Sequence, residues 1–327
     1  MMFTRRWLLQ PMWLLLLAIG AGAQTQVEPY PSRPVKVISD SAPGSSVDVT
    51  LRLVADRLSQ AWGQQVLAVN QPGAGGAIAA RAAAEAVPDG YTLFMPALSI
   101  FLNTPGRAAN LPLELPRDFA PVASISEQPI FIAVAPSLGI STLPELIALA
   151  KQRPGELSYA ATGVGRLTHL TGELLQSRAG IKLQLVPYSG GPTHALNDVI
   201  GGRIPIIIEA YSGLAGAVQA GKLKPIAQGA LQRLPDFPDV PTVAETFPGF
   251  NSVGWQVLLA PNGTPEAIIR KIGSDLREVL AQPEIKKQLA LRGGYPRPMS
   301  PDEIIGFVRN QQQTWNPLLQ QFVAQPK

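Results

Sequence analysis

The sequence predicts an α/β protein built of two lobes, each a mostly parallel sheet flanked by helices. Three observations carry this prediction: short runs rich in valine and isoleucine, helix-period segments between them, and glycine or proline turns at the junctions. Strand, turn and helix repeated in this order are typical of parallel strands whose connecting helices cover the sheet. The alternation starts at residue 35, stops at a proline-rich connection and restarts at residue 129, which indicates a second lobe.

The first lobe is predicted to begin with a strand at 35–39, which enters a turn at 42–46. The next helix carries Leu51, Val54, Leu58 and Ala61 on one stripe, and Gly63 ends it. After it we expect a strand at 65–69, a glycine loop at 71–76, an alanine-rich helix through residue 87 and a strand at 91–95.

The second lobe is predicted from the same alternation. Thr142 and Glu145 have the spacing of a capping box, and so do Ser300 and Glu303 before a C-terminal helix. In this part of the chain we expect strands at 129–135, 157–160, 182–186, 203–208 and 223–228, with helices at 142–153, 168–178, 193–200 and 214–220. After it we expect a strand at 253–260 and helices from 264 onward. Strands near 121–134 and 250–259 should cross between the lobes, so lobe 1 is predicted as 24–124 plus 253–327 and lobe 2 as 125–252.

Residues 1–23 are interpreted as a signal peptide. Arg5 and Arg6 precede an apolar stretch that ends at Ile19, and Ala21-Gly22-Ala23 fits the small-x-small pattern for cleavage before Gln24. The main apolar run is under half of the roughly 20 residues that a membrane anchor needs. The paired arginines also fit a twin-arginine signal, so both export routes stay open. We expect a periplasmic protein of residues 24–327.

Composition excludes several classes of function. The chain contains no cysteine, which excludes a cysteine-linked lipid anchor, disulfides and thiolate catalysis. Without Arg5 and Arg6, 25 Lys+Arg stand against 23 Asp+Glu, a net charge of +2, and no basic run interleaves with aromatics. We therefore expect no nucleic acid partner.

The sequence offers little for a cofactor, a metal or catalysis. Ile78 and Thr168 stand where a dinucleotide-binding fingerprint needs its last glycine, and no Walker Gly-Lys-Ser/Thr occurs. His169 and His194 are the only histidines, and neither a Gly-x-Ser-x-Gly elbow nor a metal-spaced histidine pair is present. We expect no cofactor, no metal ligands and no catalytic residues, and hence no enzyme.

Glycine turns at 43–46 and 162–166 are candidate anion sites, one in each lobe. Each lies between a strand and a helix start, where glycine lets the backbone approach a ligand. The unpaired N–H groups and the partial positive charge of a helix start favour anions. The alternative is that both are merely tight turns with Ser/Thr caps. A third loop, at 73–76, also places glycines between a strand and a helix start.

Four side chains near these turns have open interpretations. Arg166 stands at a helix entrance, where its guanidinium could pair with a ligand carboxylate or simply be solvated. Glu209 follows the apolar run 204–208 and could bind an amine or hydroxyl, pair with Arg166 or be an ordinary loop charge. Asp48 could contact ligand or only complement its helix dipole. His169 could face the pocket or cap its helix.

With these turns in place, the chain resembles the substrate-binding proteins of tripartite tricarboxylate transporters, the Bug or TctC-type family. The matching segments cover nearly the whole mature chain and are specific only together. They are YPSRP at 30–34, NQPGAGG at 70–76, PDGYTL at 88–93, DFAPV at 118–122, GVG at 163–165, THL at 168–170 with Glu173, VPY at 186–188, GG at 201–202, AGKL at 220–223 and PDVPTVAE at 238–245.

The resemblance implies a periplasmic-binding-protein clamp of the type II-like class, with a hinge closing over a di-, tri- or aromatic carboxylate. It further implies delivery of the ligand to a two-component membrane permease, and we expect the protein to be a monomer. The candidate ligand-binding residues are Gly44, Ser45, Ser46, Asp48, Gly75, Ser99, Thr162, Gly165, Arg166, Thr168 and Glu209.

Three departures from the family pattern affect the candidate site. Val47 stands where a threonine is usual, and Arg166 where a serine is usual. Glu209 stands near a position where an aspartate is common. We therefore expect an unusual ligand. Two other functions stay open: a carboxylate-sensing receptor that partners a membrane sensor kinase, and a periplasmic enzyme, for which the sequence offers no good nucleophile–base pair.

Overall fold

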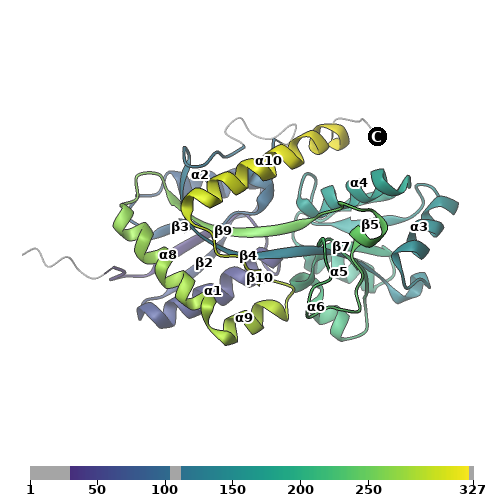
Figure 1. Ribbon diagram of the computed structural model, residues 1–327, viewed down its shortest axis with the longest axis horizontal. Coiled ribbons are helices and arrows are strands. Elements are labelled where there is room, and N and C mark those ends of the chain that lie inside the picture. The colour runs from purple at the N-terminus through teal and green to yellow at the C-terminus, as the bar shows by residue number, and fades with distance from the viewer. Residues whose placement is uncertain (1–29, 104–111, 324–327) are drawn as a thin grey trace, which may run out of the picture.

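Two groups of parallel strands, joined by one long antiparallel pair, form the framework of this computed structural model, which describes residues 30–103 and 112–323 (Figure 1). The predicted signal peptide lies outside the described residues. Among the helices that are described, none has both the length and the apolar character needed to cross a membrane.

Lobe 1 is built around β1 (Val35–Ser39), which is parallel to both of its neighbours, β2 (Val66–Asn70) and β3 (Thr92–Phe94). One apolar cluster joins this sheet to the helices α1 (Ser46–Trp62), α8 (Glu266–Ala281) and α9 (Pro283–Ala290). The short helix α2 (Ala77–Ala84) belongs to the cluster on the other face, so helices cover both faces of the sheet.

Lobe 2 repeats the plan around β5 (Ser158–Ala161), which is parallel to β6 (Gln184–Pro187) and β7 (Ile206–Ala210). The helices α3 (Leu143–Gln152) and α4 (Leu167–Ala179) contribute to one apolar cluster, and α5 (Pro192–Ile200) and α6 (Tyr211–Gln219) to another. The strand β8 (Lys224–Gln228) and the short helix α7 (Val243–Thr246) complete this lobe.

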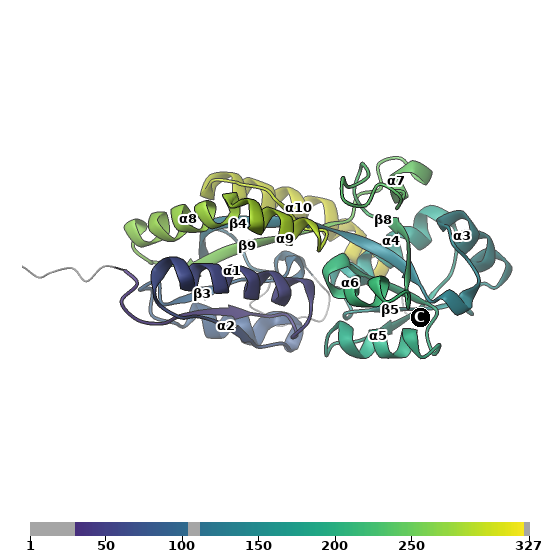
Figure 2. The same ribbon diagram turned by 90° about the horizontal axis from the view of Figure 1, so that it is seen from below.

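Two long strands connect the lobes. Residues 119–129 of β4 (Phe119–Val134) pair with β9 (Val253–Pro261), and residues 130–134 pair with β7 and β8 of lobe 2. The helix α10 (Pro301–Val323) lies along this connection and packs on both β4 and α4 (Figures 1 and 2). The predicted two-lobed α/β architecture is confirmed, while the residue boundaries proposed for the lobes stay a prediction.

Local signals explain many of the observed ends. Gly63 takes the left-handed conformation (φ 63°) after α1, and the capping boxes at Thr142 and Ser300 form as predicted. The alanine-rich helix ends at Ala84 and not at residue 87, because a residue before a proline, here Pro88, is disfavoured in helical conformation.

Two further differences concern β7 and the C-terminal region. The predicted strand 203–208 is shifted to Ile206–Ala210, since its first residue follows Pro205, and α6 then begins at once at Tyr211. Glu209 therefore lies inside a strand and not in a loop. The sequence analysis also missed α9 and the two-residue strand β10 (Tyr295–Pro296), which pairs with β4.

Candidate ligand-binding cavity

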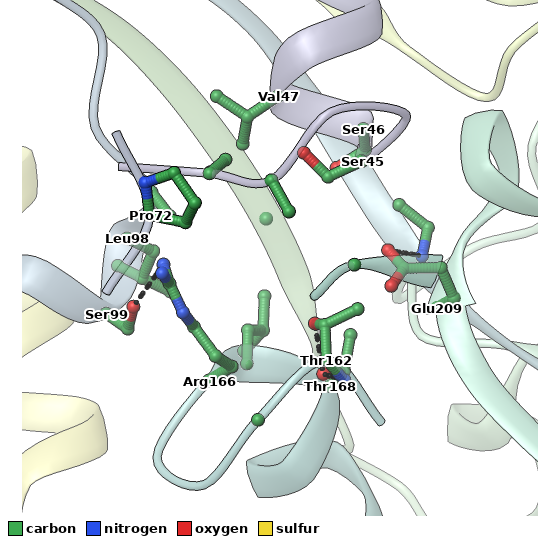
Figure 3. A pocket seen from close by; sticks show the side chains of 18 of the residues that line it. Ser45, Ser46, Val47, Pro72, Leu98, Ser99, Thr162, Arg166, Thr168 and Glu209 are labelled. Carbon is green, nitrogen blue, oxygen red and sulfur yellow. Dashed lines mark hydrogen bonds between the residues drawn. The ribbon is translucent and has the colours of Figure 1, made fainter. Parts of the chain in front are cut away.

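A cavity of about 240 Å³ lies between the two lobes. Its wall is formed by the starts of α1 and α4, the loops before α2 and α5, and residues from β4, β7 and β9. Figure 3 shows Ser45 and Ser46 on one side of this space, Thr162 and Thr168 facing them, and Arg166 and Glu209 at its two ends. Backbone from both lobes thus surrounds one space.

The turn before α1 is held from within lobe 1. Ser45 caps the helix, and its Oγ accepts the Asp48 N–H at 3.4 Å. The Asp48 carboxylate, only 3% exposed, accepts the Gly44 N–H at 2.8 Å and side-chain bonds from Arg52 and Asn70. Asp48 therefore organises the turn and does not line the cavity, and neither does Gly44.

The state of Asp48 follows from these contacts. Burial by itself raises the pKa of the Asp48 carboxyl, but the hydrogen bonds from Arg52, Gly44 and Asn70 outweigh it and hold the pKa below its ordinary value. Asp48 is therefore ionised at neutral pH, and the turn carries a fixed negative group behind it.

The turn before α4 is tied by its own helix. The Thr162 N–H donates to Thr168 Oγ1 at 3.1 Å, and the two hydroxyl oxygens are 2.9 Å apart. The Gly165 N–H donates to His169 Nδ1 at 3.1 Å. His169 thus ties the turn to its helix and does not line the cavity, and α4 has no side-chain cap at its N-cap residue, Arg166. Gly163 and Val164 line the cavity, whereas Gly165 does not.

Arg166 is bonded to lobe 1. Its Nη1 donates to Asp40 Oδ2 at 2.8 Å and to Ser99 Oγ at 3.1 Å, and its Nη2 donates to the Asp40 carbonyl at 3.1 Å. Asp40 is fully buried, and its Oδ1 accepts the Ala97 N–H. The sequence analysis considered a solvated Arg166 or one paired with Glu209, and both are wrong.

Gly76 makes room for this ion pair. It has φ 98°, and a Cβ at this position would lie 2.8 Å from Asp40 Oδ2. A larger residue would therefore push the Asp40 carboxylate off its partner. The glycine loop at 73–76, predicted as an anion site, thus also positions a carboxylate of the protein.

Glu209 is the least satisfied charged group in the wall. It is 3% exposed, and its Oε1 accepts the N–H of the next residue, Ala210, at 2.9 Å. Its Oε2 is buried and has no partner within the ranges 30–103 and 112–323. Burial raises the pKa of Glu209 to about 7, against smaller opposing effects from the Ala210 N–H and the Arg166 charge.

A buried glutamine network forms part of the wall. Gln256 Nε2 donates to Gln128 Oε1 at 3.0 Å, and Gln128 Nε2 donates to Thr50 Oγ1 at 2.8 Å. The sequence analysis missed both glutamines. The available signal was Gln256 as the one polar side chain with a hydrogen-bonding amide in β9, and in β4 a run of polar residues, Ser126 to Gln128, next to an apolar segment.

The structure gathers most of the predicted candidates. Ser45, Ser46, Gly75, Ser99, Thr162, Arg166, Thr168 and Glu209 line the cavity, whereas Gly44, Asp48 and Gly165 stand behind it. Contact with a ligand stays a prediction for all of them. Within the described chain, no cluster of His, Cys, Asp and Glu could hold a metal ion.

Comparisons with known proteins agree with this architecture. The family described as "TctC: Tripartite tricarboxylate transporter family receptor" matches residues 50–323. Protein BugT of Bordetella pertussis is 33% identical over 311 residues, covering 94% of this chain and 95% of BugT.

Two solved structures with bound ligands are similar to this chain over most of its length. Rpa4515 of R. palustris with adipate has a TM-score of 0.84 and 30% identity, covering 88% of this chain and 97% of that one. MatC of Rhodopseudomonas palustris with bound malate has a TM-score of 0.79 and 29% identity, covering 89% of this chain and 100% of that one. The chain therefore has the predicted periplasmic-binding-protein fold and belongs to the TctC family of tripartite tricarboxylate transporter receptors.

Proposed function

We propose that this receptor captures a small carboxylate between its two lobes and delivers it to a tripartite tricarboxylate-type transporter. The observation that carries the proposal is a single cavity lined by the starts of helices from both lobes. The N–H groups and partial positive charge at such ends favour an anion. The hydroxyls of Ser45, Ser46 and Thr162 add neutral donors.

The size and closure of the cavity support a small ligand. Its volume of about 240 Å³ lies below the roughly 300–1,000 Å³ of sites for drug-sized molecules. The lobes meet directly beside it: a Cβ at Gly191 would lie 2.9 Å from Ala42 Cβ and 3.2 Å from the Pro43 carbonyl. Excluding water strengthens each polar contact inside.

Family membership supports the assignment to transport. The structurally similar proteins carry adipate and malate, both carboxylates. We propose a periplasmic protein that is cleaved after Ala23, acts as a monomer and docks on a two-component membrane permease. A receptor role without catalysis also fits the wall, whose described residues include neither histidine nor lysine.

A thermal-shift screen of the mature chain against mono-, di-, tri- and aromatic carboxylates tests the ligand class. A ligand that binds only the folded state at 100 times its Kd adds about 2.7 kcal/mol of stability. We expect at least one carboxylate to raise the melting temperature. A panel in which only neutral sugars or cations do so would refute the proposal.

Mass spectrometry of exported protein tests the proposed signal peptide and its cleavage site. We expect an N-terminus at Gln24, and a chain that retains Met1 would contradict it. Replacing Arg5 and Arg6 with lysine distinguishes the routes, because continued export argues against dependence on twin arginines.

A further inference from the structure

Glu209 has an oxygen that the described protein does not use. The residue lies at the end of β7, and Oε1 is held by the N–H of Ala210. Oε2 is shielded from solvent and lacks a hydrogen-bond partner in the part of the chain that the structure describes. Leaving a buried polar group without a hydrogen-bond partner is destabilising, and more so when the group is charged. Something outside the protein is expected to satisfy it.

The surroundings of Glu209 leave one direction open. Within the sheet, its backbone stands opposite Phe131 of β4. On the α6 side, Gly213 packs so closely that a Cβ there would lie 3.0 Å from Glu209 Cγ. Figure 3 shows the carboxyl group turned toward the space shared with Ser45 and Thr162. The free oxygen therefore faces the cavity.

No described residue of the wall offers Glu209 a counter-charge. Arg166 is the one basic side chain that lines the described cavity, and its two Nη groups are bonded to Asp40 and Ser99. Together Arg166 and Asp40 are formally neutral. A ligand that brings two carboxylates would thus meet one neutral pair and one further acidic group.

We propose that Glu209 determines specificity by accepting a hydrogen bond from the ligand, so that the ligand is a small carboxylate that also carries a hydroxyl, ammonium or amide N–H. This rests on the proposed carboxylate-binding function. The helix starts take the carboxylate, and Glu209 takes the donor at the other end. A simple dicarboxylate is disfavoured, because two carboxyl groups in one dry site cannot both ionise without cost.

The experiment uses probes that differ only in the group offered to Glu209. Calorimetry at pH 8 would compare butanoate, succinate, 4-hydroxybutanoate and 4-aminobutanoate, with matching α-substituted acids and chain lengths of about three to six carbons. A charge-assisted hydrogen bond corresponds to about ten- to a hundredfold in affinity. We expect a donor-bearing monocarboxylate to bind at least tenfold more tightly than the dicarboxylate of equal length.

Matched variants assign this preference to Glu209. Glu209→Gln keeps the size of the side chain and removes the charge, and it should reduce the preference about tenfold. Glu156→Gln removes a carboxylate from an exposed position of the same lobe and should leave it unchanged. Circular dichroism verifies that both variants fold.

A measurement on the wild-type protein gives a second readout. Binding of a donor at pH 6.5 should displace a proton, detected as a binding enthalpy that varies with the ionisation enthalpy of the buffer. Other titratable or charged groups stand on or beside the elements packed against β7: Glu127, Tyr159, Arg166, His169, Glu173, Arg178, His194, Asp198 and Tyr211. The proton is assigned to Glu209 if its release disappears in Glu209→Gln.

The outcomes separate this inference from the proposed function. If no carboxylate binds, the proposed function fails and the inference with it. If carboxylates bind but the dicarboxylate is preferred, and Glu209→Gln retains that preference, carboxylate binding stands and the inference is overturned. Tighter dicarboxylate binding at low pH would also overturn it, because a protonated Glu209 would then be donating to the ligand.

Discussion

The two sides of the cavity satisfy their buried charges in opposite ways. On the lobe 1 side, Asp48 accepts hydrogen bonds from Gly44, Arg52 and Asn70, all in the same lobe. On the lobe 2 side, Arg166 reaches across the cavity to Asp40. Glu209 keeps one oxygen without a partner among the residues that the structure describes.

This difference indicates how the site is assembled. The turn before α1 is complete without lobe 2, so under the proposed function it is preorganised to receive an anion when the lobes are apart. Arg166 finds its partner only when the lobes meet, and Glu209 only when a ligand fills the space. The free energy of closure therefore depends mainly on the lobe 2 side.

Glu209→Gln should have the largest effect on stability. Burial raises the pKa of Glu209 to about 7 from an ordinary 4.5, so the folded protein keeps a proton that the unfolded chain releases between these values. The free energy of unfolding therefore falls as pH rises through this window. Removing the carboxyl should raise that free energy by about 3 kcal/mol at pH 8 and change it little at pH 5. Urea unfolding measures both, and an equal gain at the two pH values would contradict the prediction.

Asp48→Ala tests the lobe 1 side of the cavity, where the buried charge is satisfied within the same lobe. The Gly44 N–H loses its acceptor and the Asn70 amide loses one of its two, so the free energy of unfolding should fall by about 2 kcal/mol at pH 7. The hydrogen bonds that lower the pKa of Asp48 act only on the ionised form, so the loss should shrink as pH falls below the ordinary value of 3.8. Asp56→Ala, at an exposed position on the same helix, is the matched control. An equal loss of unfolding free energy in both variants would show that Asp48 does not stabilise the turn more than an exposed aspartate does.

Arg166→Met should have the smallest effect on unfolding, because the Arg166–Asp40 pair joins lobes and Asp40 can become solvated when they part. We expect the radius of gyration of the unliganded protein to increase in small-angle X-ray scattering, and carboxylate affinity to fall about tenfold. Arg203→Met, an exposed arginine of the same lobe, should change neither. A stability loss of about 3–5 kcal/mol without expansion would instead indicate a buried charge left unpaired in closed lobes.

Local chemistry explains why much of the fold was predictable. The strand at 35–39, the stop at Gly63 and the capping boxes depend on residues close together in the chain, and each formed as predicted. Errors arose where a proline acts on its neighbours. Pro88 shortened one helix, and Pro205 delayed the start of a strand. Pairing with β4 extends the same strand through Glu209.

The partners of the site residues were not predictable in the same way. Asp40 and Arg166 are 126 positions apart, and nothing near either residue indicates the other. Sequence could place Arg166 at a helix entrance, but the Asp40 partner depends on how two lobes approach. The position of Asp48 behind the cavity wall was not predictable for a related reason, because it depends on its bonds to Gly44 and to Asn70, 22 positions away.

The position of β9 has a consequence for the order of folding. This strand lies between β3 and β4 in the lobe 1 sheet, yet it follows the whole of lobe 2 in the chain. The parallel strands of lobe 2, by contrast, and the β4 segment beside them form one continuous stretch of sequence. As the chain emerges from the ribosome, lobe 2 has all its strands before lobe 1 does. The lobe that is synthesised first is therefore the one whose sheet is joined last, because β3 meets β4 only through Val253–Pro261, and β10 pairs with β4 later still.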